Sequence, residues 1–150
     1  MTTTREFLTI VIAGQEFGVP VMDIHDVLGA QATTRVPKAG PGIAGMLNLR
    51  GRIVTALDMR PCLELGPRAD GGDSIHVVVH FNGEPYGLVV DDVGDVISLA
   101  DDDCEALPKN FDPHWATLVS GVHRLEGRLL LRLNIERVVD AARVRERLAS

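Results

Sequence analysis

The chain has only two cysteines, no long apolar run and no excess of positive charge, and each shortage excludes a class of protein. No stretch approaches the ~18 apolar residues of a membrane-spanning helix, so we expect no direct insertion into a membrane. The apolar run at residues 7–13 could suggest a secretion signal. It is short, it alternates as a strand does, and Arg5 before it is cancelled by Glu6, so we interpret it as a strand.

The charge balance argues against nucleic acid as a partner. The sequence has 15 Lys and Arg against 21 Asp and Glu, a net charge of −6, which leaves no broad basic surface for a phosphate backbone. A protein surface is the better expectation for a partner.

Cysteine and histidine usage indicates neither a metal centre nor a cofactor. Cys62 and Cys104 lie far apart without metal-ligand spacing, which is typical of reduced thiols in a cytoplasmic protein, although a single disulfide between them remains open. The five histidines show no ligand spacing. The acidic groups at residues 91–95 and 101–103 lack the alternating pattern of a calcium loop, so we interpret them as solvated surface.

The 150 residues are enough for one compact domain spanning 1–150, which needs no disulfide or structural metal for stability. The composition is 45% hydrophobic and 24% charged, with 15 glycines and 8 prolines, which predicts a globular chain with many turns.

The chain repeats itself. Residues 14–28 match residues 83–97 with six identities at a constant spacing of 69, as in Gly14 and Gly83, and residues 43–54 match 119–130 at a spacing of 76. We therefore predict two copies of one unit, at about 7–65 and 75–148, with their boundary in the polar, glycine-rich stretch between them.

Each copy is predicted to be a string of short strands. Apolar residues alternate around Phe17 and Tyr86, and Asn82-Gly83 is a strong signal for a tight hairpin. Short strands joined by tight turns favour a small barrel for each copy, since closure removes exposed strand edges. Three further dipeptides are expected to turn like Asn82-Gly83: Ala13-Gly14, Arg50-Gly51 and Glu126-Gly127.

Both faces of the predicted strand at residues 53–57 are largely apolar, so one face needs a cover other than its own core. A short helix is expected from Asp58 to Leu65, with Asp58 as its N-cap. A second, C-terminal amphipathic helix is expected from its cap Asn134, with Arg143, Arg145 and Arg147 facing solvent toward its end.

The motif NLRG at Asn48–Gly51, followed by an apolar strand and Asp58-Met59-Arg60, resembles the signature of the CheW family, as does VPKAGPGIAG at residues 36–45. The resemblance covers nearly the whole chain. It implies a mainly β fold of two pseudo-symmetric, five-stranded, SH3-like β-barrels with short helices and a C-terminal amphipathic helix. It also implies a non-enzymatic adaptor that binds the regulatory domain of the histidine kinase CheA and the cytoplasmic tip of chemoreceptors, in arrays at the membrane.

The same resemblance implies site residues. Gly45 and Ile24 are assigned to the kinase contact, and Gly45 has a counterpart in Gly121. Arg50 is expected to pair with Asp26, which is one methylene shorter than the glutamate common in the family. The receptor-binding set is Arg50, Asp26, Val27, Val93 and Val96.

Most of these site residues can also be explained by a purely structural role. Ile24, Val27 and their counterparts can be core residues, and Gly45 can serve backbone conformation alone. Within the fold, the partner system can be chemotaxis or a non-flagellar pathway such as type IV pilus motility. A thiol hydrolase using Cys62 or Cys104 is the enzymatic alternative, although neither lies in a recognisable nucleophile motif.

Overall fold

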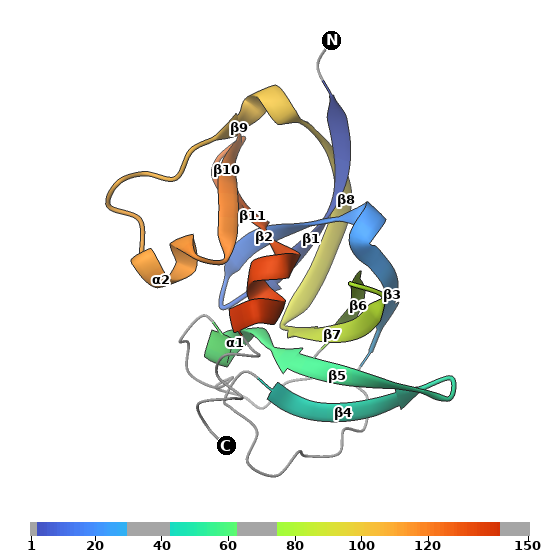
Figure 1. Cartoon of the computed structure of the whole chain (residues 1–150). Coiled ribbons are helices and arrows are strands. Elements are labelled where there is room, and N and C mark those ends of the chain that lie inside the picture. Colours follow the sequence, from blue (N-terminus) through green and yellow to red (C-terminus); the bar gives the residue numbers. More distant parts are fainter. Residues whose placement is uncertain (1–2, 30–42, 63–74, 142–150) are drawn as a thin grey trace.

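The computed structural model describes residues 3–29, 43–62 and 75–141, which form two β-sheets with short helices (Figure 1). The strands are β1 (Thr4–Ile12), β2 (Gln15–Pro20), β3 (Ile24–Leu28), β4 (Ile43–Leu49), β5 (Arg52–Asp58), β6 (Ile75–Phe81), β7 (Glu84–Val90), β8 (Asp92–Ala100), β9 (Cys104–Glu105), β10 (Val119–Leu125) and β11 (Arg128–Leu133). The helical elements are η1 (Val21–Asp23), α1 (Met59–Cys62), η2 (Asp101–Asp103), α2 (Pro113–Ala116) and a C-terminal helix at 135–141.

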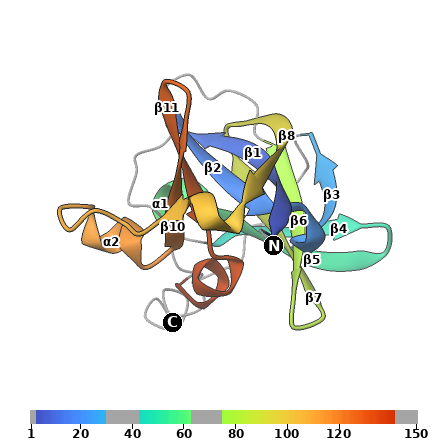
Figure 2. The ribbon, with the colours of Figure 1, turned by 90° about the horizontal axis from the view of Figure 1, so that it is seen from above.

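Each sheet combines strands from both sequence copies. The six-stranded sheet has the order β8-β1-β2-β11-β10-β9, and the five-stranded sheet has the order β3-β6-β7-β5-β4. The predicted mainly β fold of two SH3-like barrels agrees with these two sheets, although each sheet takes strands from both copies rather than from one. The second strand of each copy, β2 or β7, pairs in parallel with the last strand of the other copy, β11 or β5, and this pairing places the apolar strand faces on a shared core. Figure 2 shows β10, β11 and α2 on one side of the molecule and β3 to β7 on the other.

The register of the two sheets repeats. Phe17 of β2 lies opposite Leu131 of β11, and Tyr86 of β7 lies opposite Thr55 of β5. Phe17 and Tyr86 are separated by the 69-residue spacing of the first repeat block, and Leu131 and Thr55 by the 76-residue spacing of the second. The prediction that the two aromatic residues occupy equivalent places is confirmed.

Irregularities in the sheets also repeat. Ile24 pairs with Val79 before a register shift in β3, and Val93 pairs with Ile10 at the corresponding shift between β1 and β8. A β-bulge re-aims the side chains beside it, and its recurrence in both copies identifies it as part of the duplicated unit.

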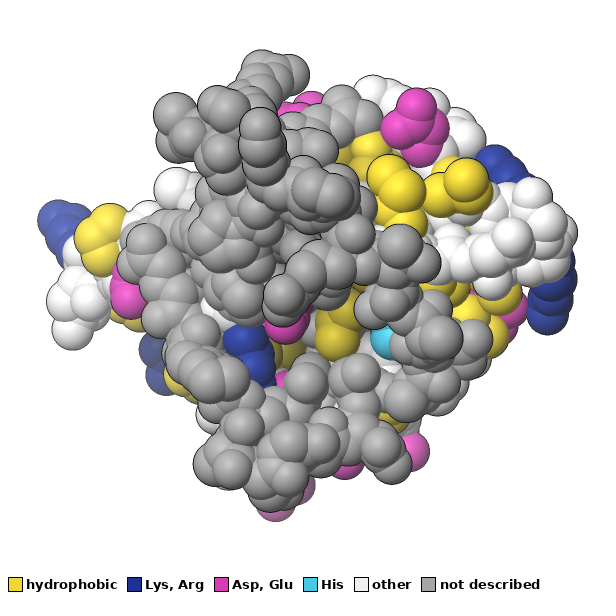
Figure 3. Space-filling model, turned by 90° about the horizontal axis from the view of Figure 1, so that it is seen from below, with side chains coloured by type: hydrophobic (Ala, Val, Ile, Leu, Met, Phe, Trp, Pro, Cys, Tyr) yellow, Lys and Arg dark blue, Asp and Glu magenta, His cyan; other side chains and the backbone are white. Residues whose placement is uncertain are grey.

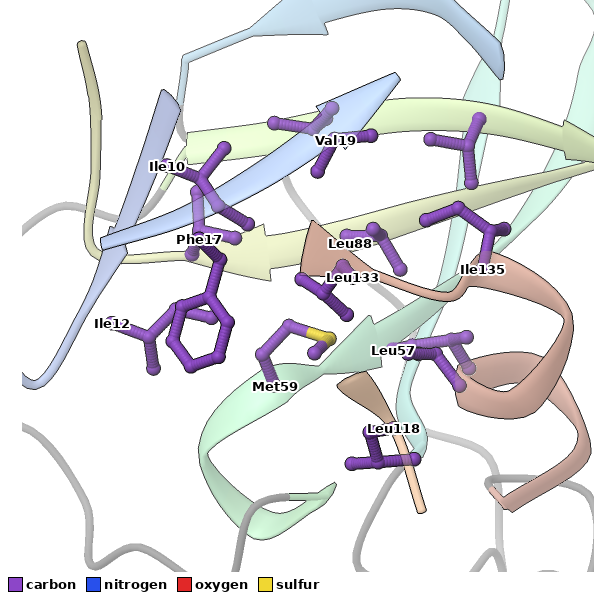
Figure 4. Close-up of a cluster of buried hydrophobic side chains, with 14 of the residues drawn as sticks. Ile10, Ile12, Phe17, Val19, Leu57, Met59, Leu88, Leu118, Leu133 and Ile135 are labelled. Carbon is purple, nitrogen blue, oxygen red and sulfur yellow. The ribbon is translucent and has the colours of Figure 1, made fainter. Parts of the chain in front are cut away.

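The larger of two hydrophobic clusters, the central cluster, lies between the two sheets (Figure 4). Phe17 is fully buried in it and Tyr86 is 6% exposed. The first turn of the C-terminal helix contributes Ile135, and β5 contributes Leu57. The six-stranded sheet and this helix thus cover Leu57, as expected for one apolar face of the strand. Ile53, at the other end of the strand, stays 68% exposed.

The hairpin predictions hold at three of four turns. Ala13, Arg50 and Asn82 have φ between 52° and 53°, and the glycine after each also has positive φ, as a type I′ turn requires. At the fourth turn Gly127 alone has positive φ, so Glu126-Gly127 turns differently.

Both predicted helices begin at their predicted caps. An Asp58 carboxylate oxygen accepts a hydrogen bond from the Arg60 N–H at 3.1 Å, and Asn134 Oδ1 accepts one from the Arg137 N–H at 3.2 Å. The continuation of the first helix to Leu65 and the arginines after residue 142 lie outside the described residues.

Candidate functional site

The NLRG motif forms the turn between β4 and β5, and the structure explains its residues. Asn48 Oδ1 accepts a hydrogen bond from the Gly51 N–H at 3.0 Å, which satisfies a backbone donor at the turn. Arg50 and Gly51 take the two left-handed positions, with φ of 52° and 83°. The turn therefore holds the Arg50 guanidinium, 77% exposed as a side chain, at the tip of the hairpin.

Arg50 reaches Asp26 across the five-stranded sheet. An Arg50 Nη atom lies 3.4 Å from Asp26 Oδ2, and the Asp26 side chain is 25% exposed. Since β3 and β4 are the two end strands of this sheet, the ion pair joins its two edges. The contact is a single long one rather than bidentate, and the other Asp26 oxygen accepts the Val27 N–H at 2.9 Å.

The apolar site residues divide into an exposed and a packed pair. Val27 on β3 is 42% exposed and Val96 on β8 is 52% exposed, and both strands are end strands of their sheets. Ile24 and Val93 are partly buried and pack against the central cluster. Val27 and Val96 are therefore available to a partner, and Ile24 and Val93 support the strands that carry them.

Gly45 lies in β4 opposite Ala56, just after a register shift between Ile43 and Gly45. Its counterpart Gly121 sits at the same point of β10, where a Cβ would overlap the Cys104 sulfur in β9. At Gly121 the absence of a side chain thus admits a neighbouring strand. The residues from 30 to 42, which precede β4, lie outside the described part of the chain.

Several surface residues were missed by the sequence reasoning. His25 and His80 face each other with ring centroids 4.5 Å apart, and Arg52 lies beside them at the start of β5. Met22 on η1 is 96% exposed. The contact between the two histidines could not be predicted from the sequence, because the register shift in β3 decides where His25 points. Figure 3 shows Lys and Arg side chains next to exposed hydrophobic side chains at the right edge of the lower face, where the β4–β5 hairpin projects in Figure 1.

One member of each acidic group, Asp91 and Asp101, forms ion pairs with arginines. Asp91 accepts two hydrogen bonds from Arg60, at 2.6 and 3.0 Å, and one from the Ala13 N–H at 2.8 Å. Asp101 accepts hydrogen bonds from Arg132 and Arg5, and the Arg132 bond is the main reason that the pKa of Asp101 is lowered. Across residues 3–29, 43–62 and 75–141, no group of three or more His, Cys, Asp or Glu side chains is arranged to hold a metal ion.

The geometry around Cys104 gives little support to the alternative of a thiol hydrolase. Cys104 of β9 lies opposite His123 of β10, but the His123 side chain is 1% exposed and packs on the Phe7 ring. Burial is the main reason that the pKa of His123 is lowered. A histidine so enclosed is poorly placed to meet a substrate. The side chain of Cys62 lies outside the described residues.

In the described part of the chain, no helix is long and apolar enough to cross a membrane.

Comparison with known proteins agrees with this architecture. A family model for the CheW-like domain matches residues 6–143. The chain is 26% identical over 140 residues to a chemotaxis protein CheW of Klebsiella aerogenes, covering 93% of this chain and 84% of that protein. It is 25% identical over 138 residues to a chemotaxis protein CheW of Bacillus subtilis, covering 92% and 88%.

The fold is also similar to the crystal structure of the scaffolding protein TtCheW from Thermoanaerobacter tengcongensis. The TM-score is 0.78 at 25% identity, with 88% of this chain and 90% of that chain covered. Because the family match spans most of the sequence and the two-sheet fold agrees with it, the chain belongs to the CheW-like domain family.

Proposed function

We propose that this chain is a non-enzymatic cytoplasmic adaptor that couples chemoreceptors to the histidine kinase CheA. The family is one of scaffolds and adaptors, and the chain matches it from residue 6 to residue 143. The observation that carries the proposal is the pair of exposed valines, Val27 and Val96, at equivalent positions on the end strands of the two sheets.

The receptor contact is proposed to include Val27, Val96 and the Asp26–Arg50 ion pair. Exposed branched side chains on a strand offer an apolar surface to the apolar face of an amphipathic helix. The ion pair joins the edges of the five-stranded sheet next to Val27, so it fixes the position of β3 relative to the hairpin. Val93 and Ile24 act beneath this surface by packing it on the central cluster.

The kinase contact is proposed to lie at β4, with Gly45 at its centre, and to include Ile24 on β3, the other end strand of the same sheet. β4 is an end strand of the five-stranded sheet, so its outer edge is the side on which another barrel can approach. A residue without Cβ at this point permits close packing, as Gly121 does for β9 in the other sheet.

Titration calorimetry with the two partners tests this function. We expect the chain to bind a CheA regulatory domain and a receptor cytoplasmic fragment, each without displacing the other. Val27→Asp should weaken receptor binding about tenfold or more, since a buried unpaired carboxylate costs well over ~1.4 kcal/mol. Leu129→Asp, on a side chain 50% exposed in β11, is the matched control for the receptor measurement. Binding of neither partner by the folded chain would refute the proposal.

A further inference from the structure

A small cavity beside the β4–β5 turn is lined by four side chains that can carry positive charge. The lining includes Arg50, Arg52, His25 and His80, and the cavity volume is about 60 Å³. We call it the basic cavity. In a chain of net charge −6, this local concentration of hydrogen-bond donors is distinctive.

His80 leaves one ring nitrogen available in the cavity. Their rings are tilted by 53° with centroids 4.5 Å apart, and His80 Nε2 is buried without a hydrogen-bond partner among the described residues. His25 is exposed in β3. A buried ring nitrogen without a partner is unfavourable, and a ligand atom that accepts or donates a hydrogen bond there would relieve it.

Arg50 and Arg52, the two arginines of the cavity, form few ion pairs with the rest of the described chain. Arg50 has one contact of 3.4 Å to Asp26, and Arg52 has no ion-pair partner among the residues that the structure describes. Its counterpart in the second copy, Arg128, lies 3.0 Å from the Glu16 carboxylate. At this equivalent point of the two hairpins, one arginine is therefore neutralised within the chain and the other is not.

We propose that the basic cavity receives a carboxylate side chain of the receptor segment that docks against β3. This inference rests on the proposed function and names the chemistry of its partner. Arginine presents several donors in a planar fork that matches a carboxylate, and His80 adds a ring nitrogen from the cavity wall.

The size and the charge of the cavity agree with this occupant. About 60 Å³ is several times the ~10–15 Å³ that one water requires, and far below the ~300 Å³ at which small-molecule sites begin. Two permanently charged guanidinium groups disfavour a cation. The incoming carboxylate would share Arg50 with Asp26 and supply Arg52 with the counter-charge that Glu16 supplies to Arg128.

The cavity can be tested without any partner protein, by nuclear magnetic resonance titration with N-acetyl-glutamic acid amide. We expect shifts of the His25 and His80 ring signals and of the Arg52 Nε signal. N-acetyl-glutamine amide, which has the same size and no charge, should leave them in place. Equal shifts with both compounds would overturn the proposal. So would shifts confined to Arg5 and Arg132, the arginines that bind Asp101 outside the basic cavity.

Receptor binding gives the second test. Arg52→Gln should weaken binding of a receptor cytoplasmic fragment five- to tenfold, whereas Arg128→Gln, the matched control, should leave the affinity unchanged. Unchanged affinity in the Arg52 variant, or a loss confined to the CheA regulatory domain, would overturn the assignment to the receptor. If the wild-type chain binds neither partner, the proposed function fails, and the glutamate titration still decides whether the cavity takes a carboxylate.

Discussion

Asp26 and Arg50 are 24 residues apart in the sequence and join the two edge strands of one five-stranded sheet through a single ion pair. The pair lies at the surface, where such contacts contribute under ~1 kcal/mol to folding. We therefore expect the pair to hold β3 and the β4–β5 hairpin in the position that a partner binds, and to contribute little to the free energy of unfolding.

The first prediction concerns this pair. Arg50→Ala and Asp26→Ala should each weaken receptor-fragment affinity several-fold while changing the free energy of unfolding by less than ~1 kcal/mol, because the edge strands lose their mutual restraint. A double-mutant cycle on the affinity should show coupling between the two changes. Asp26→Glu should be tolerated, since it lengthens the reach toward Arg50. Strict additivity would show that the residues act independently, and wild-type affinity in Arg50→Ala would remove its role.

The second prediction places the kinase contact at β4. Gly45→Arg should leave the far-ultraviolet circular dichroism unchanged and weaken binding of the CheA regulatory domain at least tenfold, because a long cationic side chain would separate two closely packed barrels. Calorimetry measures the affinity. An unchanged affinity in a folded variant would remove Gly45 from the site.

The third prediction concerns the buried His123, whose two ring nitrogens have no hydrogen-bond partner among the described residues. The equivalent position in the first copy is Leu47, so His123→Leu reproduces a side chain that the fold already accepts. We expect the variant to raise the free energy of unfolding by about 1–2 kcal/mol near neutral pH, since it removes two unsatisfied polar atoms. Chemical denaturation measures this change, and a clear destabilisation would contradict the account.

The same variant has a predicted pH dependence. The pKa of folded His123 lies below the ordinary 6.5, mainly because of burial, with a further contribution from Arg132. As the pH falls below about 6.5, the unfolded chain takes up a proton that the folded chain resists, so wild-type stability declines. In His123→Leu that part of the decline should be absent. Identical pH profiles for the two proteins would exclude His123 as the cause.

The fourth prediction concerns Asp91, which lies between β7 and β8 and contacts both α1 and the β1–β2 turn. Asp91→Ala should lower the free energy of unfolding by about 3 kcal/mol, because it removes the carboxylate paired with the largely buried Arg60 and the acceptor of the Ala13 N–H. Asp95→Ala, on an exposed position of β8, should change it by less than ~0.5 kcal/mol. Denaturant midpoints at constant slope would report both changes. Equal effects in the two variants would contradict the structural role of Asp91.

The sequence predicted the fold well because duplication left its spacing in the chain. The strands around Phe17 and Tyr86, the hairpin turns and the caps Asp58 and Asn134 all follow from local patterns. Which strands share a sheet did not follow, because two similar copies offer the same apolar faces to their own strands and to those of the other copy. Only the packed structure decides between these pairings.

The site was predictable in part. The Asp26–Arg50 contact came from the family resemblance and is present in the structure, whereas the roles of Gly45, Ile24 and the valines in binding stay predictions. The His25–His80 contact could not be anticipated, because it depends on the bulge that turns His25 toward β6. Burial of Ile24 and Val93 also depends on packing that periodicity does not report.

The most direct test of the adaptor function is a kinase assay in which receptor fragment, CheA and this chain are combined and each is omitted in turn. We expect receptor control of CheA autophosphorylation to require the chain and to be lost with Val27→Asp, although that variant still binds the CheA regulatory domain. Receptor control that is equally strong without the chain, or unaffected by Val27→Asp, would exclude the adaptor function proposed for this chain.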